Sequence, residues 1–315
     1  MAKQILFALD DSETAGGALR NLGALLAPAD VHLHLFHAAL DTSYFYPGEL
    51  STLSGKPGPW EKAQEEQAEA ILRRAFDLLQ QMGVPPTRIE REFVRRGANA
   101  AQEILAAGER LAPSAIAVAR KGRSGIKLFF LGSTTTQVCQ YAERVSVWVV
   151  GNRHLEPPRV LAALDESPYA DRVVAHVGEH FGRLPGTRVT LFHVIAAKPP
   201  GLWDDGHILD ETERSERNRT LAHWRNEQAR QTADRFSRAK DELTATGLPE
   251  ENIAVLHQAM AAGIARDILA EASRGEYNIL VFGRRGTSAI KEFALGNRAA
   301  KLLHSPSDLT LILVG

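Results

Sequence analysis

The sequence contains a single cysteine, Cys139, and aromatic residues make up only 7% of its 315 residues. One thiol cannot form an intrachain disulfide, a zinc ribbon or a paired-cysteine redox motif, so we expect a reducing, cytoplasmic environment. Uninterrupted apolar runs of about eighteen residues, which a membrane-spanning helix needs, are also missing. The first apolar run stops at Asp10 and Asp11, too early for a signal peptide. We therefore expect neither membrane insertion nor secretion.

Charge of one sign is not in excess either. Lys and Arg number 37 against 38 Asp and Glu, which leaves a formal net charge of -1. A chain without a polybasic field is not expected to bind nucleic acid or an anionic membrane. The hydrophobic content of 44% is that of an ordinary globular protein, and the length favours about two domains.

The chain contains a long internal repeat. Residues 5–14 (ILFALDDSET) match residues 160–169 (VLAALDESPY). Further along, residues 126–133 (IKLFFLGS) match residues 290–297 (IKEFALGN) at an offset of 164. Repeats of this length predict two similar domains in one chain.

The domain boundary is predicted in the polar, proline-bearing stretch 152–158. We place one domain at residues 1–152, called half one below, and the other at residues 158–315, called half two. In each half, short apolar runs alternate with longer helical patterns, which predicts an α/β, Rossmann-like fold with a five-stranded parallel sheet. The strands are expected near residues 4–9, 31–37, 88–94, 114–119 and 145–150, and again near 159–164, 187–194, 252–257, 278–282 and 309–314. The helices are expected near residues 13–26, 61–82, 98–111, 133–144 and 211–245.

A glycine motif follows the fourth strand of each half. Half two reads GRRG over residues 283–286, then nine residues, then GN at 296–297. Half one reads ARKG over residues 119–122 and GS at 132–133, with the same spacing. Glycine after a strand permits positive φ and lets the backbone approach a phosphate, and the start of a helix offers free amides. The motif therefore predicts an anion cradle beyond the carboxyl ends of the strands.

These motifs, found in order and twice, resemble the universal stress protein family. The shared features are a first strand that ends in aspartate before a D-x-S-type helix start, a second strand that ends in His-Val, and the G-x2-G-x9-G-[S/T] signature. The resemblance covers nearly all of the chain, as two family domains. It implies the five-stranded fold of the adenine nucleotide α-hydrolase-like group and, for the nucleotide-binding branch of the family, an ATP site.

The resemblance implies a role for particular residues in each half. Asp10 and Asp165 match the aspartate near the ribose and adenine, and Ala38 and Val194 match the position that contacts the base. The phosphate-loop positions are Ala119, Gly122, Gly132 and Ser133 in half one, and Gly283, Gly286, Gly296 and Asn297 in half two. Each half departs once, since Ala119 replaces the first glycine and Asn297 replaces Ser or Thr. Half one keeps the phosphate end of the motif and is slightly favoured for that reason.

Ordinary structural roles stay open for several of these residues. Glycine after a strand and Ser or Asn before a helix are common turn and cap residues, and the two aspartates also fit helix caps. The loops contain basic residues that either neutralise phosphates or are simply exposed, namely Arg120, Lys121, Arg123, Arg284 and Arg285.

Other reactive side chains favour structural roles. His176, Glu179 and His180 fit the H-x-x-E-H pattern of inverted zinc peptidases, but no third ligand is identifiable. Cys139 has no neighbouring base in the sequence that would activate it. The remaining histidines on or after the second strands are expected to pack or to end loops: His32, His34, His37 and His193.

The resemblance implies a stress-response protein that binds ATP, with or without Mg²⁺, in one or both halves and acts as a sensor or signalling module. Neither loop positions a general base for water, so at most slow hydrolysis is expected. An adenylating enzyme would need an S-G-G-x-D-S-type loop, which is absent. The alternative function is a nucleotide-free interaction scaffold or a binder of a small apolar ligand, with loops 41–60 and 197–210 over its cavity.

The last strand of each half, at residues 145–150 and 309–314, is almost wholly apolar. An open edge of this kind invites aggregation, so it needs a partner. In universal stress proteins the fifth strands lie near a dimer contact. We therefore expect these two strands to pair within the chain as a pseudo-dimer, which leaves open whether two chains pair again as a homodimer.

Overall fold

The structure is a computed structural model, and it describes residues 3–40, 59–96, 99–120, 131–195, 210–286, 295–305 and 307–315. The sequence singles out two long loops, at residues 41–60 and 197–210. Nearly all of both lies outside these ranges, namely residues 41–58 and 197–209. The same holds for Gly122 and the neighbouring Lys121 and Arg123.

Half one has the predicted order of strands and helices. Its elements are β1 (Lys3–Ala8), α1 (Glu13–Leu26), β2 (Val31–Leu40), α2 (Pro59–Gln81), the short 3-10 helix η2 (Pro86–Arg88), β3 (Ile89–Arg96), α3 (Ala100–Leu111), β4 (Ala115–Ala119), α4 (Ser133–Tyr141) and β5 (Ser146–Val150).

Half two repeats this order. Its elements are β6 (Arg159–Ala163), α5 (Tyr169–Phe181), β7 (Arg188–Ile195), α6 (Glu211–Ala245), the 3-10 helix η3 (Glu250–Asn252), β8 (Ile253–Ala259), α7 (Ile264–Arg274), β9 (Ile279–Gly283), α8 (Asn297–Leu303) and β10 (Thr310–Val314).

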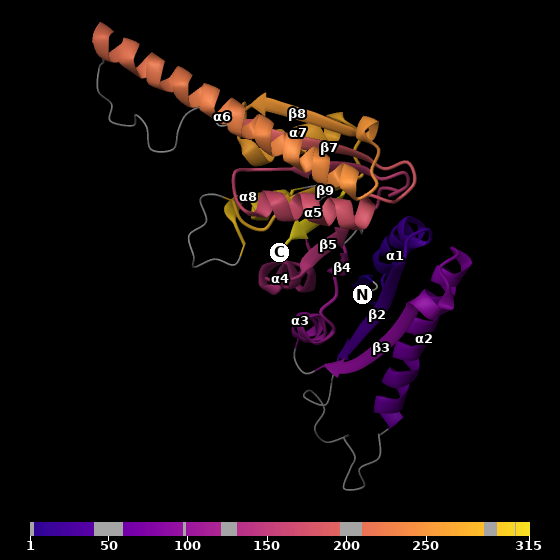
Figure 1. The fold of residues 1–315 in the computed structure, drawn as a ribbon. Helices are drawn as coiled ribbons and strands as arrows, with labels where there is room; N and C mark the ends of the chain where they lie inside the picture. The colour runs from indigo at the N-terminus through magenta and orange to yellow at the C-terminus, as the bar shows by residue number, and fades with distance from the viewer. Residues whose placement is uncertain are drawn as a thin grey trace.

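The strands form one continuous ten-stranded sheet in the order β3-β2-β1-β4-β5-β10-β9-β6-β7-β8 (Figure 1). Neighbouring strands within each half are parallel, as the alternation of strands and helices predicts. Between the halves, β5 and β10 pair antiparallel, with Val149 opposite Leu311 and Trp148 opposite Ile312. The predicted pairing of the two last strands is confirmed, and it covers both apolar edges within one chain.

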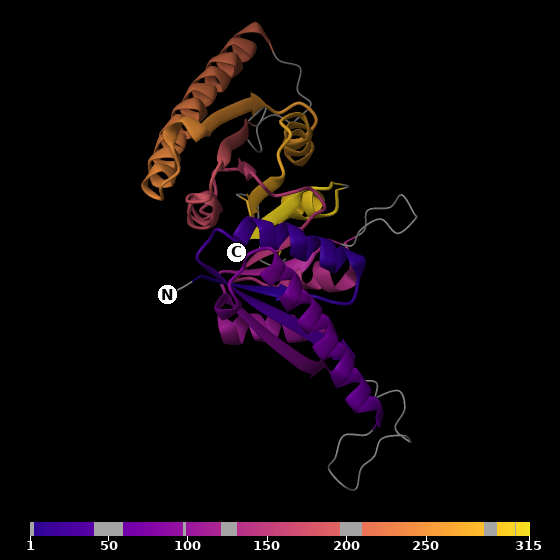
Figure 2. The same ribbon diagram turned by 90° about the vertical axis from the view of Figure 1, so that its right-hand side faces the viewer.

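Helices cover both faces of the sheet, and equivalent helices of the two halves share a face (Figure 2). One core packs α1, α2, α5 and α6 against the sheet, and the other packs α3, α4, α7 and α8. Both strands at the junction are buried along their whole length. Continuous apolar strands are needed here because helices exclude water from both faces of the sheet.

The sequence of α6 has one apolar stripe, at Leu221, Trp224, Ala229, Phe236 and Leu243, but the stripe is not packed along its whole length. Phe236 and Leu243 are buried in the core, whereas Ala229 is exposed. The N-terminal part of α6 extends beyond the sheet in both ribbon views, where the described residues offer no core for it to pack against (Figures 1 and 2).

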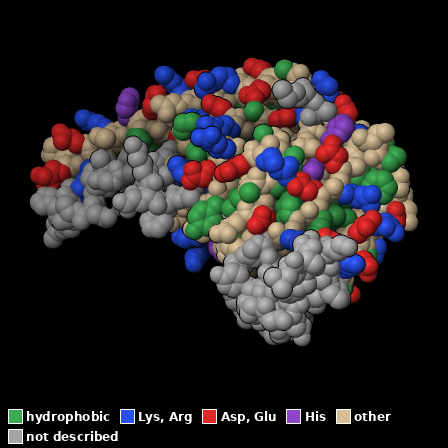
Figure 3. All heavy atoms as spheres, turned by 90° about the horizontal axis from the view of Figure 1, so that it is seen from below, with side chains coloured by type: hydrophobic (Ala, Val, Ile, Leu, Met, Phe, Trp, Pro, Cys, Tyr) green, Lys and Arg blue, Asp and Glu red, His purple; other side chains and the backbone are tan. Residues whose placement is uncertain are grey.

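Acidic and basic side chains are intermingled on the face drawn in Figure 3, as the near-zero net charge suggests. Among the described residues, no helix is long and apolar enough to cross a membrane.

Candidate functional site

A cavity of about 470 Å³ lies beyond the carboxyl ends of β6, β7 and β9 in half two. Apolar side chains from the strand ends and from α7 and α8 form much of its wall: Ala163, Leu164, Phe192, Val194, Phe282, Ile264, Ile268, Ala299 and Leu302. Its polar groups come from the loops after β6 and β9, and also from β7, α6 and the start of α8. Ligands of open α/β sheets bind at this end, because the strand ends and the following loops converge there. The volume is in the range of small-molecule sites.

The structure brings all the predicted half-two residues together in this cavity. The lining includes Asp165, Val194, Gly283, Gly286, Gly296 and Asn297. They come from residues 165–194 and 283–297, two distant parts of the chain, so their convergence is a property of the fold.

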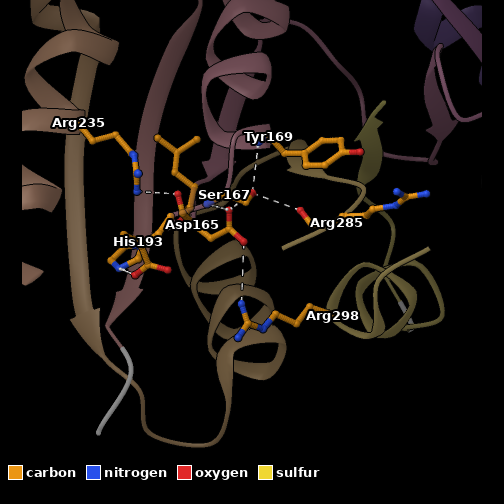
Figure 4. A network of polar contacts seen from close by, with 9 residues as sticks. Asp165, Ser167, Tyr169, His193, Arg235, Arg285 and Arg298 are labelled. Atoms are coloured by element: carbon orange, nitrogen blue, oxygen red, sulfur yellow. Dashed lines mark hydrogen bonds and ion pairs between the residues drawn. The ribbon is translucent and has the colours of Figure 1, made fainter. Parts of the chain in front are cut away.

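Asp165 lies at the centre of the polar side of the cavity (Figure 4). Its Oδ1 accepts hydrogen bonds from the amide of Ser167 at 3.0 Å and from the Ser167 hydroxyl at 2.5 Å. Its Oδ2 lies 4.0 Å from Nη1 of Arg298, and its backbone oxygen accepts a bond from Arg235 at 2.8 Å. One carboxylate oxygen therefore shapes the turn, while the other faces the cavity.

The same turn is present in half one, where Asp10 Oδ1 accepts from the amide and hydroxyl of Ser12. Ser12, not Asp10, is the N-cap of α1, with its side chain accepting from the amide of Ala15. In half two the N-cap position is Pro168, without a side-chain bond. A direct helix-cap role for the two aspartates is therefore wrong, since each holds the serine two residues further on.

The loop glycines of half two are required by close approach and not by positive φ. None of the described motif glycines has positive φ, so that part of the sequence argument is wrong. A Cβ on Gly286 would lie 2.7 Å from Asp165 Oδ2, and one on Gly296 would lie 3.2 Å from the backbone oxygen of Arg284. A Cβ on Gly283 would lie 2.6 Å from the Cβ of Tyr169, so this glycine accommodates α5.

Arg284 and Arg120 are neither phosphate ligands nor exposed side chains. Arg284 is 0% exposed and crosses into half one, where it donates to the backbone oxygens of Cys139 at 2.6 Å and Ala142 at 2.5 Å, at the end of α4. Arg120 donates in the reciprocal direction, to Leu303 and Ser305 at the end of α8. A cation at the C-terminus of a helix is stabilised by the free carbonyls and by the helix dipole.

The reciprocal bonds of these two arginines across the halves correct the prediction that they neutralise phosphates or are exposed, and burial explains why. Burial lowers the pKa of both guanidinium groups, Arg120 and Arg284, but arginine stays charged in proteins. Buried cations must be hydrogen-bonded, and the carbonyls at the end of the opposite last helix are the partners that the β5–β10 junction places within reach.

Arg285 also turns away from the cavity centre. Its side chain points away from Asp165, and its Nη2 lies 3.6 Å from Oε1 of Glu143 in half one (Figure 4). Its backbone oxygen is 3.4 Å from the Ser167 hydroxyl. The basic group at the polar side of the cavity is instead Arg298, one residue after the motif.

The remaining motif residues start helices in an equivalent way. Gly132 and Gly296 are the N-cap residues of α4 and α8, and neither makes a side-chain cap bond. Ser133 and Asn297 follow as the first helical residues and are exposed, so Asn297 does not cap.

In half one, Ala38 lies within β2 beside Val94 of β3, and Ala119 ends β4 and is half-buried. Thr135 in the first turn of α4 donates to the Ala119 backbone oxygen at 3.3 Å. Because the loop at 121–130 lies outside the described residues, the phosphate side of half one is not part of the described site.

Two histidines tie the second strand of each half to the end of the first. Nδ1 of His37 bonds the Leu9 oxygen at 2.8 Å, and Nδ1 of His193 bonds the Leu164 oxygen at 2.9 Å. His193 also lies in the cavity wall, with Nε2 3.5 Å from Glu166. Sequence reasoning expected loop-end roles here, and the two bonds agree with that.

The H-x-x-E-H segment is structural. His176 and His180 are buried beneath Trp148 of β5, and Nε2 of His176 accepts a bond from the Trp148 indole at 2.9 Å. Burial lowers the pKa of His176 to about 3 and that of His180 well below its usual value. Among the described residues no group of three or more ligating side chains suits a metal ion. Burial also raises the pKa of Cys139 to about 12.

Sequence reasoning missed several residues of the cavity. Arg298 follows the motif directly, but a single arginine in a helix is no signal on its own. Three side chains of α6 also line the cavity, Trp224, Gln228 and Gln231. Their helix is far from the motifs in the chain, but their i, i+4 and i+7 spacing, which places them on one face of a helix, is a signal that could have found them.

Comparisons with known proteins agree with the fold. The profile of the universal stress protein family matches residues 1–151 and again residues 157–312. A universal stress protein from Archaeoglobus fulgidus is similar in structure, with a TM-score of 0.62 and 18% identity over 100% of this chain and 98% of that chain. A functionally unknown protein from Pseudomonas aeruginosa has a TM-score of 0.65 and 14% identity, over 99% of this chain and 92% of that one.

These two structures support the fold alone, because their sequences have diverged so far. No curated protein sequence matches the chain. The two family matches cover nearly all of it, one in each half. The chain therefore belongs to the universal stress protein family and contains two family domains in tandem.

Proposed function

We propose that this protein binds an adenine nucleotide in the half-two cavity and acts in the stress response as a nucleotide-dependent sensor. One observation carries the proposal: the cavity gathers every half-two position that the family motifs predict, from Asp165 to Asn297. Asp165 Oδ2 is an acceptor for ribose hydroxyls, and the Arg298 guanidinium is a donor for phosphate oxygens. Val194 and the surrounding apolar wall suit the base.

The carboxylates of the cavity, Asp165 and Glu166, are too few to hold Mg²⁺ alone. Mg²⁺ in nucleotide sites is shared between one or two carboxylates and the phosphates. We propose that the nucleotide phosphates bring the metal, because Asp165 is already assigned to the ribose. The described residues position no general base for water, so we propose binding with at most slow hydrolysis.

The sensor role is supported by the connection between the loop and the other half. Residues 283–286 line the cavity, and Arg284 within them is bonded to the end of α4. A ligand that moves this loop would therefore change the packing of half one. The domain limits 1–152 and 158–315 belong to this proposal, with residues between them as the connector.

A second candidate function is a binder of a small apolar ligand, or an interaction scaffold without nucleotide. The apolar wall of the cavity favours it, as do the two departures at Ala119 and Asn297. This candidate does not require the polar side at Asp165 and Arg298.

Calorimetric titration of the nucleotide-stripped protein with ATP and Mg²⁺ tests the two functions. We expect saturable binding that Arg298→Ala weakens by about tenfold to a hundredfold, the usual worth of a charge-assisted hydrogen bond. The matched control is Arg230→Ala, whose side chain is 80% exposed on α6 and should change nothing. Absence of binding at millimolar ATP would refute the nucleotide proposal and leave the second candidate.

A further inference from the structure

The long helices α2 and α6 share a sequence repeat that the family motifs do not include. Residues 60–83 and 224–247 align without a gap at an offset of 164, the offset that also relates the two glycine motifs. The identical pairs are Trp60 and Trp224, Gln64 and Gln228, Gln67 and Gln231, Arg74 and Arg238, Ala75 and Ala239, Asp77 and Asp241, Leu79 and Leu243, and Gly83 and Gly247.

The fold accounts for the C-terminal end of this repeat. Leu79 and Leu243 are both fully buried in the core. Gly83 and Gly247 follow the helices with φ of 90° and 105°, a region that favours glycine. These identities are needed for packing and for ending the helix.

Packing does not account for the W-x3-Q-x2-Q segment at the other end. Gln67 and Gln231 are exposed, and Gln64 and Gln228 are half-exposed. Polar surface positions have little effect on stability, so nothing in the core preserves the same residue in two halves that differ at most other positions. A role in binding, outside the core, explains better why α2 and α6 carry the same W-x3-Q-x2-Q residues.

In half two the three side chains of this segment line the cavity. Trp224, Gln228 and Gln231 are spaced i, i+4 and i+7, which places them on one face of α6. All three belong to the same cavity wall as Asp165 and Arg298. Trp224 is half-buried, and its aromatic ring is the largest flat surface that any side chain brings to the cavity.

We infer that Trp224, Gln228 and Gln231 form a wall that recognises the base of the nucleotide, an inference that rests on the proposed function. An indole ring stacks on a purine. A glutamine amide both donates and accepts, and it matches the N6 and N7 edge of adenine. Trp224 supplies the stacking surface, and Gln228 selects the base, because the Gln231 amide nitrogen already donates to Oε1 of Glu227 at 3.0 Å.

The test compares ATP affinity across variants of the full-length, nucleotide-stripped protein. Trp224→Ala is expected to weaken ATP binding by about tenfold to a hundredfold, and Trp224→Phe to restore most of it, since phenylalanine also stacks. Asn226→Ala is the control, because Asn226 is exposed on α6 and does not line the cavity. Thermal melting of each variant reports its folding.

The role of Gln228 is tested with a second ligand. Gln228→Ala is expected to weaken ATP severalfold but to leave the affinity for purine riboside triphosphate, which lacks the 6-amino group, nearly unchanged. A merely structural role would lower both affinities equally.

Three results would overturn the inference. If Trp224→Ala kept ATP affinity within about twofold of the unmodified protein, the role of Trp224 in base recognition would be refuted, while the proposed nucleotide site would be unaffected. If Trp224→Phe lost binding as fully as Trp224→Ala, with a lower melting temperature, the ring would be structural. If the unmodified protein bound no ATP, the proposed function would fail and this inference with it.

Discussion

Replacing Arg284 with methionine tests whether the two halves are held together by the buried arginines. The Arg284 guanidinium is 0% exposed and donates to the oxygens of Cys139 at 2.6 Å and Ala142 at 2.5 Å. Methionine keeps much of the apolar volume but has no donor. Both carbonyls at the end of α4 would then lose their partner inside the protein.

The size of the effect follows from these contacts. A hydrogen bond to a charged group contributes ~1.5–3 kcal/mol, so the two short bonds together contribute ~3–6 kcal/mol. Removing the cation also relieves part of its desolvation cost, which reduces the net loss. We expect Arg284→Met to lower the free energy of unfolding by about 2–4 kcal/mol. The loss should depend little on salt, because the group is buried.

Urea unfolding followed by tryptophan fluorescence measures this loss. Trp148 on β5 is fully buried at the junction and reports its opening, while far-UV circular dichroism reports the helices. Arg230→Ala, with its side chain 80% exposed, is the matched control and should change stability by less than about 0.5 kcal/mol. A loss of less than about 0.5 kcal/mol for Arg284→Met would refute the reasoning, and Arg120→Met should behave like Arg284→Met.

Three further predictions concern stability and reactivity. The pKa of His176 is about 3 in the folded protein against 6.5 in the unfolded chain. Its contribution to the free energy of unfolding is therefore complete above pH 6.5 and is lost as the pH falls towards 3. At about pH 5 the free energy of unfolding should be about 2 kcal/mol lower than at neutral pH because of His176, and His180 adds to this loss. Urea unfolding at several pH values measures it. Unchanged stability between neutral pH and about pH 5 would contradict the prediction. Separately expressed residues 1–152 and 158–315 should each dimerise or aggregate through the exposed last strand, and halves that stay monomeric and well folded at high concentration in sedimentation would disprove this. Cys139, buried with a pKa of about 12, should react with a thiol reagent only after unfolding, and fast reaction of the native protein would show that α4 opens.

Patterns that are local in the chain predicted most of the fold. Strand and helix limits agree with the structure to within a few residues, because alternating apolar runs and 3.6-residue periods are set by which side chains must leave water. The internal repeat predicted two similar domains, and the apolar last strands predicted the β5–β10 pairing. An unpaired apolar edge has few other stable arrangements.

Contacts between distant residues were decided by the tertiary structure alone. In the sequence, Arg120 and Arg284 both resemble phosphate ligands, because each lies in a glycine motif beside other basic residues. Their partners are 142 to 185 positions away, and only the antiparallel junction of the halves places those carbonyls beside them. Likewise, Trp224 reads as part of a packed stripe until the fold turns its helix face towards the ends of β6, β7 and β9. The sequence determined which segments become strands, helices and glycine loops, whereas only the packing of the two halves decided which charges are buried and which side chains meet in the cavity.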